Sequence, residues 1–224
     1  MEVINQSVKF RPYQPASLEC VFSVADAART CYQSEKGGVE KEVELIKRCI
    51  RKGHESVLEH INIGVSFITD RGVTHELVRH RLAAYSQEST RYVKYQGGMR
   101  FIQPVWLPNL IRVWDHQSVY WARQRGDISD QEFYWLMGCQ QSEIQYSRLI
   151  DSGWSPQQAR TVLNNSLKTQ IEMTCNLREW RHILRLRCSK AAHPQMRELM
   201  RQTLSIFVNT YTPFFQDIWH EVEG

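Results

Sequence analysis

The stretch EKEVELIKRCIRKGHESVLEHINIGVSF, residues 40–67, contains both kinds of secondary structure that the chain is expected to use. In residues 40–52 the apolar side chains recur at helical spacing, and Gly53 follows as a residue suited to ending a helix. In residues 61–67 apolar side chains alternate with other residues, which is the period of a half-buried strand. This stretch therefore predicts a helix followed by a strand.

Working outward, the helix signals outnumber the strand signals. Ser129 and Glu132 have the spacing of a capping box, and Ser155-Pro156 resembles a second helix start. The expected helices are residues 40–52, about 73–81, 129–152, 155–173, 177–191 and 194 to before 213. We therefore predict one α+β domain over residues 1–224, with long helices around a smaller antiparallel or mixed sheet.

Composition excludes several classes of protein. The 224 residues are 42% hydrophobic and 23% charged, as in globular proteins and unlike disordered chains. No apolar run approaches the roughly 18 residues that a membrane span needs, and the first residues lack the pattern of a secretory signal. Six scattered cysteines without a C-x-x-C pair argue against a zinc knuckle or a disulfide scaffold, so we predict no metal site and a cytoplasmic location.

The positive charge is concentrated in two segments. Residues 71–100 hold six Lys/Arg and two Asp/Glu, and residues 176–201 hold seven and two, whereas the whole chain has a net charge of only +4. Two compact basic segments on an otherwise acidic chain indicate localised anionic ligands more than a general polyanion surface.

The first basic segment contains RHRLAAYSQESTRY, residues 79–92. On a helix, Arg79 and Arg81 would point about 200° apart and could serve two anionic groups. The polar run that follows offers hydroxyls and, as a turn, backbone N–H groups, which are the parts of a phosphate site. A solvated basic helix end with a polar loop remains the alternative.

The second basic segment separates its arginines by helix face. Arg178, Arg181, His182 and Arg185 fall on one side of the expected 177–191 helix, as a solvated polar stripe would. Arg187 falls on the apolar side, where a charge needs an anion or a carboxylate partner. In the preceding expected helix, an arginine at position 160 heads the apolar stripe, where an anion or simple snorkelling would explain it.

Arg79-His80-Arg81, seven further residues and then Ser89 resemble the RHR-x7-S motif of the flavin-dependent thymidylate synthases without a gap. The run from Asn176 to Arg187 resembles the C-terminal half of the same family, and the resemblance covers roughly residues 20–210. It implies that family's α+β fold and a homotetramer whose active sites combine residues of several subunits.

The resemblance also implies the site residues. Those implied to hold FAD are His54, Ser56, Glu59, Arg79, His80, Arg81, Gln87, Asn176, Arg178 and His182. Those implied to bind dUMP are Glu76, Arg79, Gln87, Glu88, Ser89, Thr90, Arg91, Arg160, Leu186 and Arg187, with Arg187 as the catalytic cation. The chain departs from the usual family pattern at Ala84, Gln87 and His182.

The implied reaction is reductive methylation of dUMP to dTMP. The family takes the carbon from 5,10-methylenetetrahydrofolate and the hydride from reduced FAD, which NADPH recharges, so the cofactors carry the difficult chemistry. Nucleic acid and membrane are not expected partners. Two alternatives stay open, a basic nucleic-acid-binding module and an inactive relative that binds nucleotide without turnover.

Overall fold

A computed structural model describes residues 1–95, 97–107 and 109–223. In chain order its helices are α1 (Ser17–Tyr32), α2 (Val39–Arg51), the 3-10 helix η1 (Glu55–His60), α3 (Arg71–Leu77), α4 (His116–Gln124), α5 (Asp130–Asp151), α6 (Pro156–Ala159), the 3-10 helix η2 (Arg160–Val162), α7 (Leu177–Cys188), α8 (Pro194–Thr210) and α9 (Thr212–Glu223). Its strands are β1 (Glu2–Ile4), β2 (Ser7–Phe10), β3 (Asn62–Asp70), β4 (Ala83–Gln87), β5 (Arg100–Ile102) and β6 (Lys168–Asn176).

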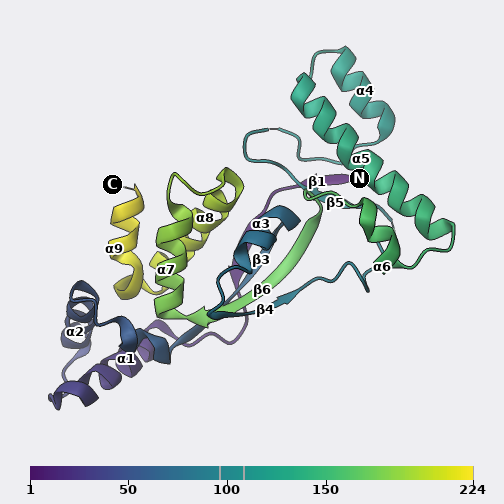
Figure 1. Ribbon diagram of the computed structural model, residues 1–224. Helices are drawn as coiled ribbons and strands as arrows, with labels where there is room; N and C mark the ends of the chain where they lie inside the picture. The colour runs from purple at the N-terminus through teal and green to yellow at the C-terminus, as the bar shows by residue number, and fades with distance from the viewer. Residues whose placement is uncertain (96, 108, 224) are drawn as a thin grey trace. The chain divides into compact units, whose positions relative to one another are not determined.

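The strands form two small sheets. The larger has the order β2-β3-β6-β4, and the smaller pairs β1 with β5 in parallel, with Glu2 opposite Arg100. Figure 1 shows β3, β6 and β4 side by side, with α7 continuing directly from the end of β6. The predicted α+β class, with long helices around a smaller sheet, is confirmed.

Local sequence explains where several helices begin and end. The Ser129 hydroxyl accepts the Glu132 backbone N–H, and the Glu132 carboxylate accepts the Ser129 backbone N–H at 2.7 Å, which is the capping box predicted for α5. Gly53 follows α2 with φ +73°, a conformation that glycine adopts without steric cost. The predicted helices over 40–52, 129–152, 177–191 and 194–213 are confirmed to within a few residues.

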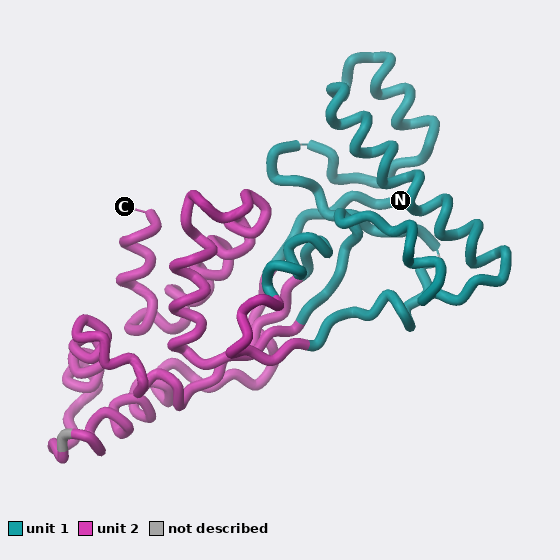
Figure 2. Tube along the Cα trace, viewed as in Figure 1, with its two compact units in different colours: residues 1–7, 68–77, 86–171 teal, residues 8–67, 78–85, 172–224 magenta. Residues whose placement is uncertain are grey.

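The chain forms two compact units, coloured separately in Figure 2. Unit 1 comprises residues 1–7, 68–77 and 86–171, and unit 2 comprises residues 8–67, 78–85 and 172–224. Trp114 and Leu136 are fully packed in the core of unit 1. The core of unit 2 is aromatic, because the Phe207 ring lies 5.0 Å from that of Trp180 and 4.7 Å from that of Phe215. The single domain over 1–224 stays a prediction.

The helix predicted over 155–173 is wrong. After α6 and η2 the chain becomes β6, in which Thr169, Ile171, Met173 and Cys175 are buried at every second position. The apolar residues behind the helix prediction are four apart, and four is a multiple of the strand period as well as close to a helical turn. The arginine at 160 therefore heads no apolar helix stripe, and it is exposed.

The helix predicted over 73–81 ends early, since α3 stops at Leu77. Arg79 and Arg81 lie in the turn that follows, so the helical angle between them does not apply. The next residues form the strand β4 where a polar loop was expected. Ala83, Tyr85 and Gln87 are its half-buried positions and alternate with exposed Ala84 and Ser86, a pattern too polar to predict a strand.

Candidate functional site

The start of α7 forms one wall of a pocket in unit 2. Asn176 ends β6 and caps α7, because its Oδ1 accepts the Glu179 backbone N–H at 2.8 Å. The pocket has a volume of about 680 Å³. Its lining residues are Glu55, Glu59, Leu82, Asn176, Arg178, Glu179, His182 and Arg185.

Four residues predicted for the flavin, Glu59, Asn176, Arg178 and His182, lie together in this pocket. Arg178 Nη1 lies 2.5 Å from Glu59 Oε1, so an ion pair joins α7 to η1 across the pocket wall. Two other residues of that prediction, His54 just before η1 and Ser56 within it, are exposed. Cations, carboxylates and an amide line one pocket, which can therefore hold a ligand rich in phosphates and hydroxyls.

Arg187 and His80 form a second contact in unit 2. Arg187 Nε donates to His80 Nε2 at 3.0 Å, and the His80 side chain is 6% exposed. An acceptor at Nε2 requires a neutral imidazole with its proton on Nδ1, and Nδ1 lies 3.8 Å from Glu179 Oε1. Burial, and then the charges of Arg187 and His182, lower the pKa of His80 to about 4.

The histidine of the RHR segment thus acts as an acceptor that holds a half-buried arginine. The Tyr85 hydroxyl donates to the His80 backbone carbonyl at 2.9 Å and fixes the backbone of the turn. Arg79 and Arg81, on either side of His80, are exposed. Leu186, the residue before Arg187, is also exposed. Arg187 thus has a specific buried neighbour within unit 2, but this neighbour is a neutral imidazole and not the anion or carboxylate that the sequence analysis expects.

The residues predicted for the nucleotide lie mainly in unit 1, around the end of β4. The Gln87 amide donates to Thr74 Oγ1 at 3.0 Å and to Thr169 Oγ1 at 3.3 Å. The Glu88 carboxylate pairs with Lys168 Nζ at 2.7 Å and accepts the Tyr95 hydroxyl at 3.1 Å. Both side chains are thus held by neighbours inside unit 1.

The turn over residues 89–91 offers hydroxyls and one guanidinium. Ser89 Oγ accepts the Arg91 backbone N–H at 3.3 Å, and Arg160 Nη1 lies 3.5 Å from the hydroxyl of buried Thr90. Glu76, on α3 of the same unit, is half-buried. The structure thus brings Arg160 beside the serine-containing turn, as expected for a phosphate site.

Burial makes two of the cysteines, Cys175 and Cys188, unsuited to act as nucleophiles. Cys175 and Cys188 are buried beside the site segments, and burial raises the pKa of each thiol, to about 12 for Cys188. A thiol with so high a pKa holds almost no thiolate at neutral pH. Among the residues that the structure describes, no three His, Cys, Asp or Glu side chains gather in a way that could hold a metal ion.

Sequence reasoning missed five residues of unit 2. Four of them line the pocket but were not in the predicted set: Glu55, Leu82, Glu179 and Arg185. Arg181, assigned to a solvated stripe, is 0% exposed. Its side chain contacts the Phe214 carbonyl and the Asp217 carboxylate of α9, and the apolar residues Phe214 and Ile218 of that helix are a sequence signal that it packs against the core.

Comparison with known proteins decides the family. The sequence model of the family described as "Thymidylate synthase complementing protein" (Thy1) matches residues 19–211. The chain belongs to this family. A relative from Geobacter sulfurreducens named flavin-dependent thymidylate synthase is 32% identical over 205 residues, covering 87% of this chain and 80% of the relative. A relative from Mycobacterium avium with the same name is 34% identical over 198 residues, covering 85% and 76%.

This Thy1 chain also resembles solved structures. A structure described as the UMP/dUMP methylase PolB from Streptomyces cacaoi bound with 5-Br dUMP matches with a TM-score of 0.75 and 23% identity, covering 96% of each chain. The same methylase with 5-Br UMP matches with a TM-score of 0.71. At 23% identity the likeness establishes the fold. Separately, among the described residues of the Thy1 chain, no helix has the length and apolar character needed to cross a membrane.

Proposed function

We propose that this enzyme methylates dUMP to dTMP, taking the carbon from 5,10-methylenetetrahydrofolate and the hydride from FAD reduced by NADPH. The observation that carries the proposal is the pocket of unit 2, where Asn176, Arg178 and His182 meet Glu59. The His80 ring lies 6.1 Å from that of His182 and accepts from Arg187, which is on the same helix as Arg178. The relatives' names and the ligand of the PolB structure support the same choice of cofactor and substrate.

The donor set of the pocket fits FAD. Arg178 offers a guanidinium to a diphosphate, and Glu59 offers a carboxylate to ribose or ribityl hydroxyls. His182 and the exposed side chain of Leu82 offer an imidazole and an apolar surface to a flat ring system. We propose that these residues and Asn176 hold FAD, together with the remaining members of the predicted set: His54, Ser56, Arg79, His80, Arg81 and Gln87.

The protein's own part in the reaction is to bind, orient and polarise. FAD, when bound, supplies the hydride that completes the methyl group. The guanidinium of Arg187 stabilises negative charge on the uracil ring while its C5 is nucleophilic. Neutral His80 accepts from Arg187 Nε and so fixes the plane of that guanidinium.

For the nucleotide we propose the turn of unit 1 and its neighbours. The side chains assigned to dUMP are Glu76, Arg79, Gln87, Glu88, Ser89, Thr90, Arg91, Arg160, Leu186 and Arg187. Arg160 and Arg91 offer guanidinium groups to the phosphate, and the Ser89 hydroxyl offers a neutral donor. The internal contacts of Gln87 and Glu88 support a role in shaping the turn as well as in touching the nucleotide.

We propose further that the chain acts as one functional domain in a cytoplasmic homotetramer with shared active sites. Exposed aromatic side chains such as Trp106, Trp121 and Tyr134 support a subunit interface. Mixing an Arg160→Ala protein with an Arg187→Ala protein tests the sharing, because one intact site forms when complementary subunits combine. Recovery of activity is expected, and its absence in a mixed oligomer would contradict shared sites.

Release of tritium from 5-tritiated dUMP tests the reaction. We expect tritium release to depend on both NADPH and 5,10-methylenetetrahydrofolate. A protein that binds FAD and dUMP yet releases no tritium would be an inactive relative. A protein that binds neither, but binds oligonucleotides with a strong salt dependence, would support the nucleic-acid-binding alternative.

A further inference from the structure

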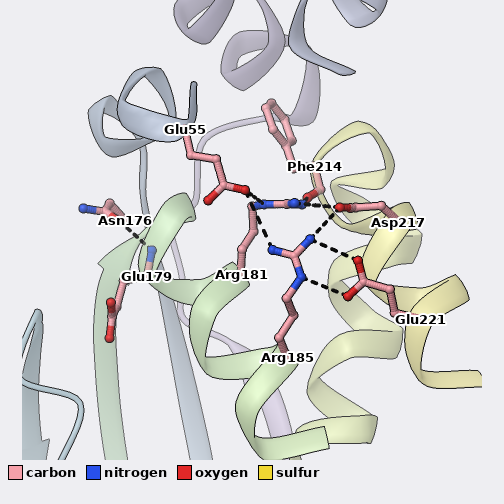
Figure 3. Close-up of polar contacts among 8 residues, drawn as sticks. All are labelled: Glu55, Asn176, Glu179, Arg181, Arg185, Phe214, Asp217 and Glu221. Carbon is pink, nitrogen blue, oxygen red and sulfur yellow. Dashed lines mark hydrogen bonds and ion pairs between the residues drawn. The ribbon is translucent and has the colours of Figure 1, made fainter. Parts of the chain in front are cut away.

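The C-terminal helix α9 reaches the buried guanidinium of Arg181 on α7 (Figure 3). Arg181 Nη1 and Nη2 lie 2.8 Å and 2.6 Å from the two carboxylate oxygens of Asp217, and Nη1 also donates to the Phe214 carbonyl. Arg181 Nε donates to Glu55 Oε1 at 3.1 Å. One fully buried side chain therefore joins α7, α9 and η1.

Arg185, about one turn further along α7, joins the same cluster. Its Nη2 lies 2.8 Å from Asp217 Oδ2, and its Nε lies 2.9 Å from Glu221 Oε2 (Figure 3). Its Nη1 lies 3.8 Å from Glu55 Oε1. Asp217 is thus the carboxylate of α9 that contacts both arginines, whereas Glu221 contacts Arg185 alone in the contacts drawn.

Two residues of this cluster also belong to the wall of the pocket. Glu55 and Arg185 line the pocket that holds Asn176, Arg178 and His182. Burial would raise the pKa of Asp217, but the hydrogen bond and charge of Arg181, and then the charge of Arg185, outweigh it and hold that pKa below its usual range. Asp217 is therefore an anion in the folded protein.

Loss of the Asp217 charge would leave Glu55 as the carboxylate that contacts Arg181, whereas Arg185 would keep Glu221. A buried guanidinium without its carboxylate is strongly unfavourable, so Arg181 would draw on Glu55 or shift toward water. Either response moves Glu55, Arg185 or the start of α7, all of which form the pocket. The wall of the pocket thus depends on a residue of α9, a helix that lies beyond the residues 19–211 matched by the family.

We propose that Asp217 is a positioning residue for the flavin pocket, holding Arg181 and Arg185 so that Glu55 and α7 keep the pocket in its binding shape. The assignment rests on the proposed function, because it takes FAD as the ligand. The positioning role predicts that loss of Asp217 lowers the affinity for FAD, which is opposite to the change that simple electrostatics predicts. Removing a carboxylate near an anionic ligand should tighten binding if charge alone mattered, whereas loss of positioning weakens it.

The test is a titration of the flavin-free protein with FAD, in which the fluorescence of FAD reports binding. Circular dichroism checks that each variant is folded. Asp217→Asn should weaken FAD binding about 10-fold, as expected for a residue coupled to a binding site through a contact network. Glu221→Gln is the matched control, because it removes the same charge from the same helix but leaves Arg181 paired. It should change the affinity by less than about 2-fold.

Two further variants keep the result decisive. Asp217→Glu keeps the charge but displaces it by one methylene, and should weaken FAD binding about 3-fold, even if Asp217→Asn does not fold. Glu42→Gln breaks a buried ion pair with Arg29 elsewhere in unit 2, so a purely structural loss of stability is expected to leave FAD affinity unchanged.

The assignment would be overturned if the folded Asp217 variants bind FAD as tightly as Glu221→Gln, or if Glu42→Gln weakens binding equally. A wild-type chain that binds no FAD would overturn the proposed function itself, and this assignment with it.

Discussion

Acid should destabilise unit 2 through His80. The imidazole is buried and accepts from Arg187, and its pKa falls from the ordinary 6.5 to about 4. Between these two pH values the unfolded chain binds a proton that the folded chain excludes. Stability therefore rises with pH across this window, is fully present above about pH 6.5, and is lost as the pH falls toward 4.

The magnitude follows from the size of the shift. One pH unit corresponds to about 1.4 kcal/mol per titrating group, so the contribution of His80 changes by about 2 kcal/mol between pH 6.5 and 5 and by about 3 kcal/mol by pH 4. The assay is urea unfolding of the wild type and of His80→Gln at half-unit steps from pH 7 to 5. Glutamine does not titrate, and its side-chain oxygen can still accept from Arg187.

We expect the free energy of unfolding of the wild type to fall more steeply with acid than that of His80→Gln, by about 1.4 kcal/mol per unit between pH 6 and 5. Other titrating groups are common to both proteins and cancel in the difference. Parallel curves would refute the reasoning, since they would mean that His80 keeps an ordinary pKa or is not held by Arg187.

Three more predictions follow from the site and its support. Arg187→Ala should leave the fold and FAD binding intact and lower dUMP turnover at least about 100-fold, as measured by tritium release; unchanged turnover would remove Arg187 from the mechanism. Cys175→Ala should keep measurable turnover, because the thiol is buried and its pKa is raised; a folded, FAD-loaded variant with no turnover at all would argue for a cysteine nucleophile. Glu42→Gln should lower the free energy of unfolding by about 3 kcal/mol, because it leaves the half-buried Arg29 without its carboxylate, which lies 2.9 Å away; denaturant unfolding that matches the wild type would contradict this.

Local signals predicted the elements whose ends are marked in the sequence. Ser129 and Glu132 mark the start of α5, and Gly53 marks the end of α2, because caps and left-handed glycines act through neighbouring residues alone. Residues 163–171 were misread because a four-residue spacing suits both periods, and only pairing with β3 and β4 makes β6 a strand. The local sequence does not show which strands will pair with one another.

The same limit of local sequence explains which site residues were predicted and which were missed. The family pattern around Glu59 and in the run from Asn176 predicts four of the pocket's lining residues, Glu59, Asn176, Arg178 and His182, because those residues carry the pattern themselves. The RHR segment predicts none of them, since Arg79, His80 and Arg81 are not among the lining residues. Arg181 shares a helix face with Arg178 and Arg185, and helical angle alone cannot distinguish a solvated stripe from one covered by α9. Burial by a segment more than thirty residues later depends on tertiary packing, which periodicity does not report.

The visible absorption spectrum recorded during a dUMP titration shows whether FAD and dUMP bind together with Arg187 at the nucleotide. The FAD-loaded wild type is expected to show a flavin band that changes on addition of dUMP, and Arg187→Ala the same band without the change. A chain that shows no flavin band after incubation with FAD, or an Arg187→Ala protein that responds to dUMP as the wild type does, would contradict this expectation.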